Sequence, residues 1–257
     1  MQVNRLHPTF AAELIGADAA RPDAALIATV EALMSEHAVL CIRDQGHLDD
    51  EQHLAFARSF GPLELPGPRR EGEQRIAYGL YNVSSLDEQG EIIDTQSAQA
   101  KFSKGNELFH ADSSFNDMPS KWSMLRAVIL PPERGDTHFI DMRAMQPLVR
   151  TSASGRKSLF VGSHAWRVAG MDEAEGAALL AELMAFATQP QNIFAHKWRP
   201  GDMPIWDNRC TIHRGTEFDY ARYKRDLRRA NVNESGEERS MIPDSVGPDS
   251  FKLEQKP

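Results

Sequence analysis

The stretch 107-ELFHADSSFND-117 places a histidine and an aspartate two residues apart, at His110 and Asp112. In a β-strand, side chains two positions apart lie on the same face, so both groups could reach one metal ion. A metal site of the 2-His-1-carboxylate type needs one further imidazole and leaves positions open for other ligands. The segment 206-WDNRCTIHRG-215 offers His213 for that role. Taken alone, the H-x-D pair could equally be a solvated hydrogen-bonded pair.

The segment 222-RYKRDLRRANV-232 contains arginines that could bind anions. Arg225 and Arg229 are spaced so that they share one face of a strand. Such a face could simply be basic and exposed. Alternatively, one guanidinium could bind the carboxylate of a co-substrate in a bidentate manner while its neighbour binds a second anion.

The elements that would position these residues predict a mainly β fold with helical buttresses. Strand-like segments predominate, among them ELFHAD, SMLRAVIL, THFIDM, KSLFVGSHAWRV, TIHRG and LRRANVN. Helical spacing of apolar residues appears at 23–37, 49–61 and 172–188, whereas 62–106 reads as loops with short strands. This pattern favours a β-sandwich or jelly-roll barrel. We expect one domain over 1–257, with a surface or disordered tail from about Asn233.

The composition limits the class of protein. With 257 residues, 41% hydrophobic and 26% charged, the chain can bury a substantial core. No apolar run reaches the roughly 20 residues of a membrane span, and no secretion signal is recognisable. Two cysteines, Cys41 and Cys210, fit a reducing cytoplasm. A net charge of -8 argues against a nucleic-acid partner but allows a small anionic ligand in a basic pocket.

Four motifs together resemble one enzyme family. HADSSF, GDT, WDNRCTIHRG and RDLRRA are similar to the iron(II)/2-oxoglutarate-dependent dioxygenases of the taurine dioxygenase superfamily. Within it, they resemble the enzymes that degrade 2,4-dichlorophenoxyacetate and related aryloxyalkanoates. The likeness extends from LHPTFAAEL to about Val232. It implies a double-stranded β-helix (jelly-roll) core that uses Fe(II), 2-oxoglutarate and O2.

The resemblance implies roles for individual residues near the metal. His110, Asp112 and His213 would be the iron ligands. Thr137 and Arg225 would bind the distal carboxylate of 2-oxoglutarate. Trp198 matches a tryptophan near that co-substrate, although it could equally be a packed core aromatic.

The organic substrate would lie beside the metal. Arg229 would hold its carboxylate and orient it for catalysis, and His164 and Asn106 would lie near it. His164 could instead be a structural histidine, and Asn106 a turn former. The implied reaction hydroxylates an aryloxyalkanoate at the carbon next to the ether oxygen, giving a phenol, succinate and CO2. Relatives are commonly oligomers, so a homo-oligomer is expected by analogy.

Three other functions are compatible with parts of the pattern. An alkylsulfonate or sulfate-ester dioxygenase would use the same arginine, because a guanidinium accepts either anion. A metal-binding barrel without turnover, or a halogenase, is disfavoured by the presence of Asp112. A zinc hydrolase would leave the GDT and R-x3-R elements without a role.

The sequence departs from the family near Met145 and Gln146. Relatives continue after 141-DMRA-144 into a helical and loop excursion, whereas this chain passes directly through MRAMQPLVR. In relatives this piece is a mobile active-site lid. Either this protein lacks it, or a segment is left out of the sequence at this point, which we favour; in both cases part of the substrate pocket is undefined by this sequence.

Overall fold

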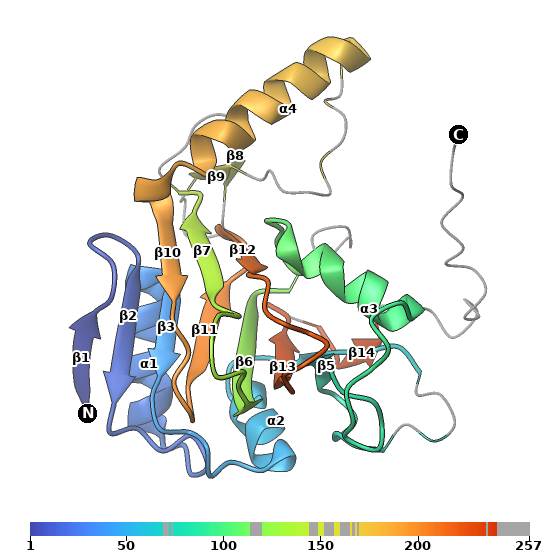
Figure 1. Ribbon diagram of the computed structural model, residues 1–257. Coiled ribbons are helices and arrows are strands. Elements are labelled where there is room, and N and C mark those ends of the chain that lie inside the picture. Colours follow the sequence, from blue (N-terminus) through green and yellow to red (C-terminus); the bar gives the residue numbers. More distant parts are fainter. Residues whose placement is uncertain are drawn as a thin grey trace.

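A large sheet forms the main layer of the molecule (Figure 1). The structure, a computed structural model, describes residues 1–68, 72, 74–113, 120–143, 149–151, 157–159, 165, 168, 170–234 and 236–240. Nine strands pair in the order β1-β2-β3-β11-β6-β13-β4-β14, and β5 also pairs with β13. They are β1 (Gln2–Arg5), β2 (Ala11–Ile15), β3 (Val39–Ile42), β4 (Leu63–Leu65), β5 (Tyr81–Ser84), β6 (Trp122–Ile129), β11 (Met203–Asp207), β13 (Asp226–Val232) and β14 (Arg239–Ser240).

A smaller sheet packs against the large one, whose other face is covered by α1 and α2, while α4 lies at the end of the smaller sheet (Figure 1). The order β10-β7-β12 joins Ile193–His196, Thr137–Asp141 and Thr211–Gly215, and β8 (Val149–Thr151) pairs with β9 (Lys157–Leu159). The helices are α1 (Ala24–His37), α2 (Asp50–Arg58), α3 (Ala98–Ser103) and α4 (Glu173–Ala187), with short 3-10 turns at Lys104–Glu107 and Pro190–Asn192.

Alternation along the strands divides the core into layers. On β11, Met203 and Ile205 belong to the apolar cluster that α1 and α2 cover. Trp206 points the other way and packs with Phe139 of β7 between the two sheets. A third cluster, which includes Ile212 of β12, lies under α4. Side chains on the inner faces of the two sheets therefore meet in one layer.

The same alternation sorts the arginines of β13. Leu227 packs between the sheets, so Arg229, two residues on, shares that face. Arg228 lies on the opposite face, where it binds Asp50 of α2 at 2.7 Å. Both Arg225 and Arg229 line a cavity between the sheets. The two arginines thus face the same cavity, but Arg225 precedes β13 and the register shifts between Asp226 and Leu227, so the predicted regular strand does not extend over both.

Most of the expected elements form, with two exceptions. The three predicted helices correspond to α1, α2 and α4, each capped by an aspartate: Asp23, Asp49 and Asp172. The predicted strand at ELFHAD is wrong: only His110 forms an isolated bridge, and the segment enters a turn. Helix α3 was not expected, since AQAKFS is too short to show helical periodicity.

Three predictions fall wholly or partly outside the described residues. These are the point of the missing lid, near 145–146, most of the strand-like segment 157–168, and most of the tail, from 241. Within the described part of the tail, β14 pairs with β4 and Glu238 binds Arg58 at 2.6 Å. None of the described helices combines the length and the apolar character that a membrane span requires.

Buried His53 of α2 predicts an acid sensitivity of the fold. Its side chain is inaccessible to solvent, and burial followed by the charge of Arg126 lowers its pKa to about 3. In the unfolded chain a histidine has a pKa of about 6.5. Between these values the unfolded state binds a proton that the native state excludes, so stability falls as pH falls.

We expect His53→Leu to reduce this pH dependence, because leucine removes the proton-binding group. From about pH 7 to about pH 5, the wild type should lose about 2 kcal/mol more unfolding free energy than the variant. Urea unfolding at the two pH values measures the difference. His47→Leu, at an exposed histidine, is the control and should follow the wild type. Equal losses in wild type and His53→Leu would contradict the assignment.

Candidate metal and anion site

Three metal-ligand side chains meet between the two sheets. His110 and His213 exchange backbone hydrogen bonds of 2.9 and 2.8 Å, which brings their rings to a centroid distance of 4.3 Å. Asp112 Oδ1 lies 3.8 Å from His110 Nε2, and Oδ2 lies 3.8 Å from His213 Nε2. All three residues are buried, and one ligand atom of each lies within 4.8 Å of the others.

A turn, not a strand, delivers the Asp112 carboxylate. The next residue, Ser113, has a φ of +54°, so the chain bends sharply at this point. Asn208 Oδ1 accepts the Asp112 backbone N–H over 3.2 Å. The Ser123 hydroxyl donates to Asp112 Oδ2 over 2.7 Å and accepts from Asn208 Nδ2 over 2.8 Å. Neighbouring strands therefore fix a carboxylate that the local chain alone would not hold.

The protonation states suit a divalent metal ion. Burial alone would raise the pKa of Asp112, but nearby positive charge, chiefly that of Arg229, lowers it to about 2. Burial lowers the pKa of His213 well below its usual value. His110 Nδ1 donates to the Leu108 carbonyl over 2.7 Å, which leaves the Nε2 side as the metal-binding face. Two imidazoles and one carboxylate form the donor set of a non-haem iron site.

Arg225 is a cation that lacks a partner among the described residues. It is buried, its Nε has no hydrogen-bond partner there, and its guanidinium lies 5.4 Å from the centre of the Phe218 ring. Burial lowers its pKa to about 10, so it remains charged at neutral pH. A buried unpaired charge is costly, and an anion that enters beside it removes that cost.

Arg229 lies closer to the metal ligands. Its Nη1 donates to Asp112 Oδ1, and its guanidinium carbon lies 5.1 Å from the centre of the Tyr81 ring. Its Nε has no hydrogen-bond partner among the described residues. One side of this arginine is thus occupied by a carboxylate of the protein, while donors remain for a second anion.

The predicted site residues gather around a small inner cavity of 60 Å³. His110, His213, Thr137, Asn106, Arg225 and Arg229 all line it. Trp198 does not line the cavity, but its Nε1 donates to Thr137 Oγ1 over 3.1 Å. His164 lies outside the described residues.

A larger cavity of 440 Å³ adjoins the inner one. Both are lined by Ser84, Ser85, Ser103, Phe218 and Tyr220. The Tyr220 hydroxyl donates to Glu107 over 2.9 Å at this junction. A ligand anchored near the metal ligands can therefore extend outward into a space of the size that small-molecule sites have.

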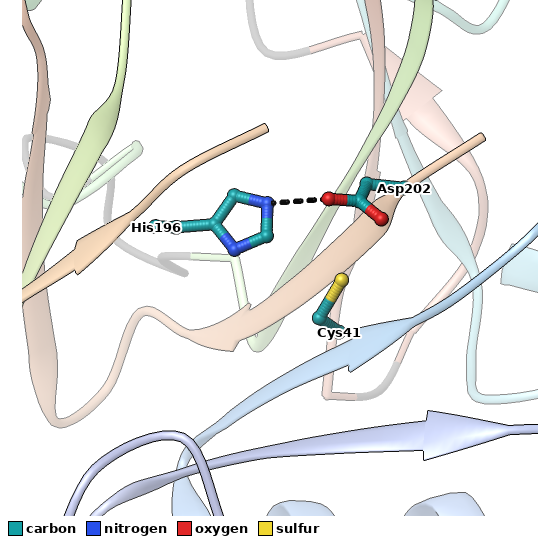
Figure 2. Close-up of side chains that lie close together, drawn as sticks. All are labelled: Cys41, His196 and Asp202. Atoms are coloured by element: carbon teal, nitrogen blue, oxygen red, sulfur yellow. Dashed lines mark ion pairs between the residues drawn. The ribbon is translucent and has the colours of Figure 1, made fainter. Parts of the chain in front are cut away.

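A second group of potential metal ligands lies elsewhere, at Cys41, His196 and Asp202 (Figure 2). Here His196 Nε2 lies 3.1 Å from Asp202 Oδ2, and Arg43 donates to the same oxygen over 2.5 Å. Arg43 also binds Glu13 at 2.7 Å. Burial raises the pKa of the Cys41 thiol well above its usual range. Because a fixed guanidinium already neutralises the carboxylate, this cluster suits a structural role better than a cation site.

Sequence reasoning missed the residues that hold the site in place. Ser123, Tyr81 and Glu64 contact the site residues or their neighbours, yet none belongs to a recognisable motif. Asn208 lies within WDNR, and its position before His213 was the one available signal.

The family model "Taurine catabolism dioxygenase TauD, TfdA family" matches residues 2–146 and 143–231. The chain belongs to this family of dioxygenases. The 2,4-dichlorophenoxyacetate dioxygenase of Cupriavidus pinatubonensis, which depends on alpha-ketoglutarate, is 36% identical over 89% of this chain and 96% of that protein. The (S)-phenoxypropionate/alpha-ketoglutarate-dioxygenase of Sphingobium herbicidovorans is 31% identical over 83% of this chain and 88% of that protein.

Solved structures agree with this assignment. AAD-2 in complex with Mn(II) and N-oxalylglycine has a TM-score of 0.81 and 32% identity, covering 95% of this chain and all of that one. A taurine dioxygenase from Burkholderia xenovorans has a TM-score of 0.74 and 26% identity, covering 97% and 93%. The predicted jelly-roll core, and with it the prediction of a 2-oxoglutarate-dependent iron dioxygenase, is confirmed.

The two matched segments of the family meet at 143–146, where the sequence departs from its relatives. The alignment with the Cupriavidus enzyme spans 278 positions, more than the 257 residues of this chain. That relative therefore carries residues that have no counterpart here.

We expect His213→Ala to weaken Mn2+ binding by at least about 100-fold, since even residues that merely orient a ligand contribute 10–100-fold to affinity. Titration calorimetry with Mn2+ measures the change. Cys41→Ser is the matched control, because it alters the other cluster, and it should bind Mn2+ like the wild type. The reverse pattern would place the metal at Cys41, His196 and Asp202.

Proposed function

We propose that this protein is an Fe(II)- and 2-oxoglutarate-dependent dioxygenase that hydroxylates an aryloxyalkanoate at the carbon next to the ether oxygen. The observation that carries the proposal is the buried set His110, Asp112 and His213 beside two inward-facing arginines. The relatives named for 2,4-dichlorophenoxyacetate and (S)-phenoxypropionate support the substrate class.

His110, Asp112 and His213 would hold the iron. When bound, iron supplies the oxidative decarboxylation of 2-oxoglutarate by O2 and the oxidation of a substrate C–H bond. The protein contributes a cavity lined by both histidines, and the lowered pKa of His213 keeps that imidazole neutral and able to bind. Its other residues place the two organic anions.

Arg225 would bind the distal carboxylate of 2-oxoglutarate. The side chain is buried and has no ion-pair partner among the described residues, so a dianion satisfies it. Thr137 would add a hydrogen bond to the same carboxylate. Its hydroxyl already accepts from Trp198, which leaves its own proton available for donation.

Arg229 would bind the carboxylate of the aryloxy acid. Because this residue also contacts Asp112, the bound acid would lie next to a metal ligand. Its α-carbon would then face the oxidant, a proximity effect. Asn106 and His164 are proposed to line the same pocket, and the aromatic ring would extend toward the outer cavity of 440 Å³.

The products follow from bond stability. One oxygen atom of O2 enters the substrate C–H bond and the other enters succinate, as 2-oxoglutarate loses CO2. The hydroxylated carbon is a hemiacetal, which collapses to a phenol and an oxo acid without further help from the protein. We further propose a cytoplasmic location, because both cysteines are buried free thiols.

A substrate panel tests the proposal. We expect succinate release with aryloxyacetates and aryloxypropionates, and much less with taurine or alkyl sulfates. The sulfate-ester dioxygenase of Pseudomonas putida is 24% identical to this chain, and a guanidinium accepts sulfate as readily as carboxylate. Succinate release that is highest with alkyl sulfates would therefore assign the enzyme to that class.

The two arginines should have separable roles. We expect Arg229→Ala to lose turnover of aryloxy acids but still bind 2-oxoglutarate, whereas Arg225→Ala should raise the KM for 2-oxoglutarate at least about tenfold. Steady-state kinetics and the visible absorption band of the anaerobic Fe(II)–2-oxoglutarate complex report the two effects. Arg228→Ala, on the opposite face of β13, is the control. Exchanged phenotypes would reverse the assignment.

A further inference from the structure

Glu64 of β4 is a buried carboxylate close to the proposed site. It is 2% exposed, and no Lys, Arg or His in the described part of the chain forms an ion pair with it. Four neutral donors satisfy it instead. Tyr81 Oη, Ser113 Oγ and Asn231 Nδ2 donate to Oε1 over 2.7, 2.6 and 3.2 Å, and Ser120 Oγ donates to Oε2.

Two of these donors touch the residues assigned to chemistry. Tyr81 is the register partner of Arg229 on the neighbouring strand, and its ring lies 5.1 Å from that guanidinium. Ser113 follows Asp112 and has a positive φ of 54°, a conformation that its short hydrogen bond to Glu64 helps to hold. The Glu64 carboxylate thus connects Tyr81, which lies beside Arg229, to the turn that carries Asp112.

A carboxylate is unusual in this place. Burying it costs free energy, and an apolar residue could join the same strands without that cost. A single anion, however, can accept several hydrogen bonds from different directions and so fix several groups at once. Burial and the neighbouring charge of Glu64 raise the pKa of Tyr81, so this phenol remains a donor.

We propose that Glu64 is a positioning residue for the active site. Through Tyr81 it sets the location of the Arg229 guanidinium, and through Ser113 it sets the turn that presents Asp112. The role of Glu64 through Tyr81 rests on the proposed function, in which Arg229 binds the organic acid. The role of Glu64 through Ser113 concerns metal binding alone and is independent of the substrate.

Single-atom changes separate the two connections. Tyr81→Phe removes only the hydroxyl and should raise the KM for the aryloxy acid about tenfold, the effect of one lost hydrogen bond to a charged group. Its KM for 2-oxoglutarate and its Mn2+ affinity should change by less than about threefold. Ser113→Ala should instead lower Mn2+ affinity about tenfold, measured by calorimetry.

Glu64→Gln should both raise the KM for the aryloxy acid and lower the affinity for Mn2+. If Tyr81 acts through Glu64, the double variant Glu64→Gln, Tyr81→Phe should have the same KM for the aryloxy acid as Glu64→Gln alone. Additive effects in this cycle would overturn the Tyr81 connection. Should Glu64→Gln fail to fold, Tyr81→Phe and Ser113→Ala still decide the matter, because both retain the carboxylate.

Glu13→Gln is the matched control. It removes another buried carboxylate of the same sheet, one that binds Arg43 at 2.7 Å far from the cavity. It should lower the unfolding temperature without changing either KM or Mn2+ affinity. A Glu64→Gln variant that behaves like Glu13→Gln would show that Glu64 only stabilises the fold.

Turnover of aryloxy acids tests the proposed function, whereas Mn2+ affinity tests the role of Glu64 at Asp112. If the wild type oxidises no aryloxy acid, the proposed function fails. The Mn2+ affinities of Ser113→Ala and Glu64→Gln still decide whether Glu64 positions Asp112, because those measurements need no organic substrate.

Discussion

The two backbone hydrogen bonds between His110 and His213 join segments that are far apart in the chain. This short bridge extends the small sheet by one residue and no further, so the chain is free to turn directly afterwards. The turn carries Asp112 back toward the large sheet, where Ser123 and Asn208 fix it. The three candidate metal ligands meet because the bridge ends directly before Asp112.

Charge is distributed unevenly between the layers. On the helix side of β13, Arg228 pairs with Asp50 and Asp226, which also bind Arg126 and Arg75, so each of these guanidinium groups has a carboxylate partner. On the inner side, Arg225 has no anionic partner among the described residues. A folded protein rarely leaves a buried guanidinium unsatisfied, so this imbalance supports the proposal that an anion binds on the inner side.

The sequence indicated which residues meet but not how they are held. Periodicity placed Arg225 and Arg229 on one face of a strand, since alternation depends only on local geometry. It failed at Asp112, because a turn stabilised by Glu64 and Asn208 replaces the expected strand. Glu64 itself gave no signal: in 61-GPLELPG-67 it looks like an exposed loop residue, and its partners come from three distant segments. Tertiary contacts of this kind leave no local pattern.

Arg229 belongs to β13, at the centre of the large sheet, and Arg225 directly precedes that strand, so the sheet fixes where both guanidinium groups enter the inner cavity. In the proposed function both anions are thereby located relative to the sheet, whereas the far end of an acid would meet only the larger outer cavity. Such an enzyme would be selective for the carbon that it oxidises and tolerant of the group attached to that carbon. The large sheet would set the position of oxidation, and the outer cavity would set the range of substrates that the enzyme accepts.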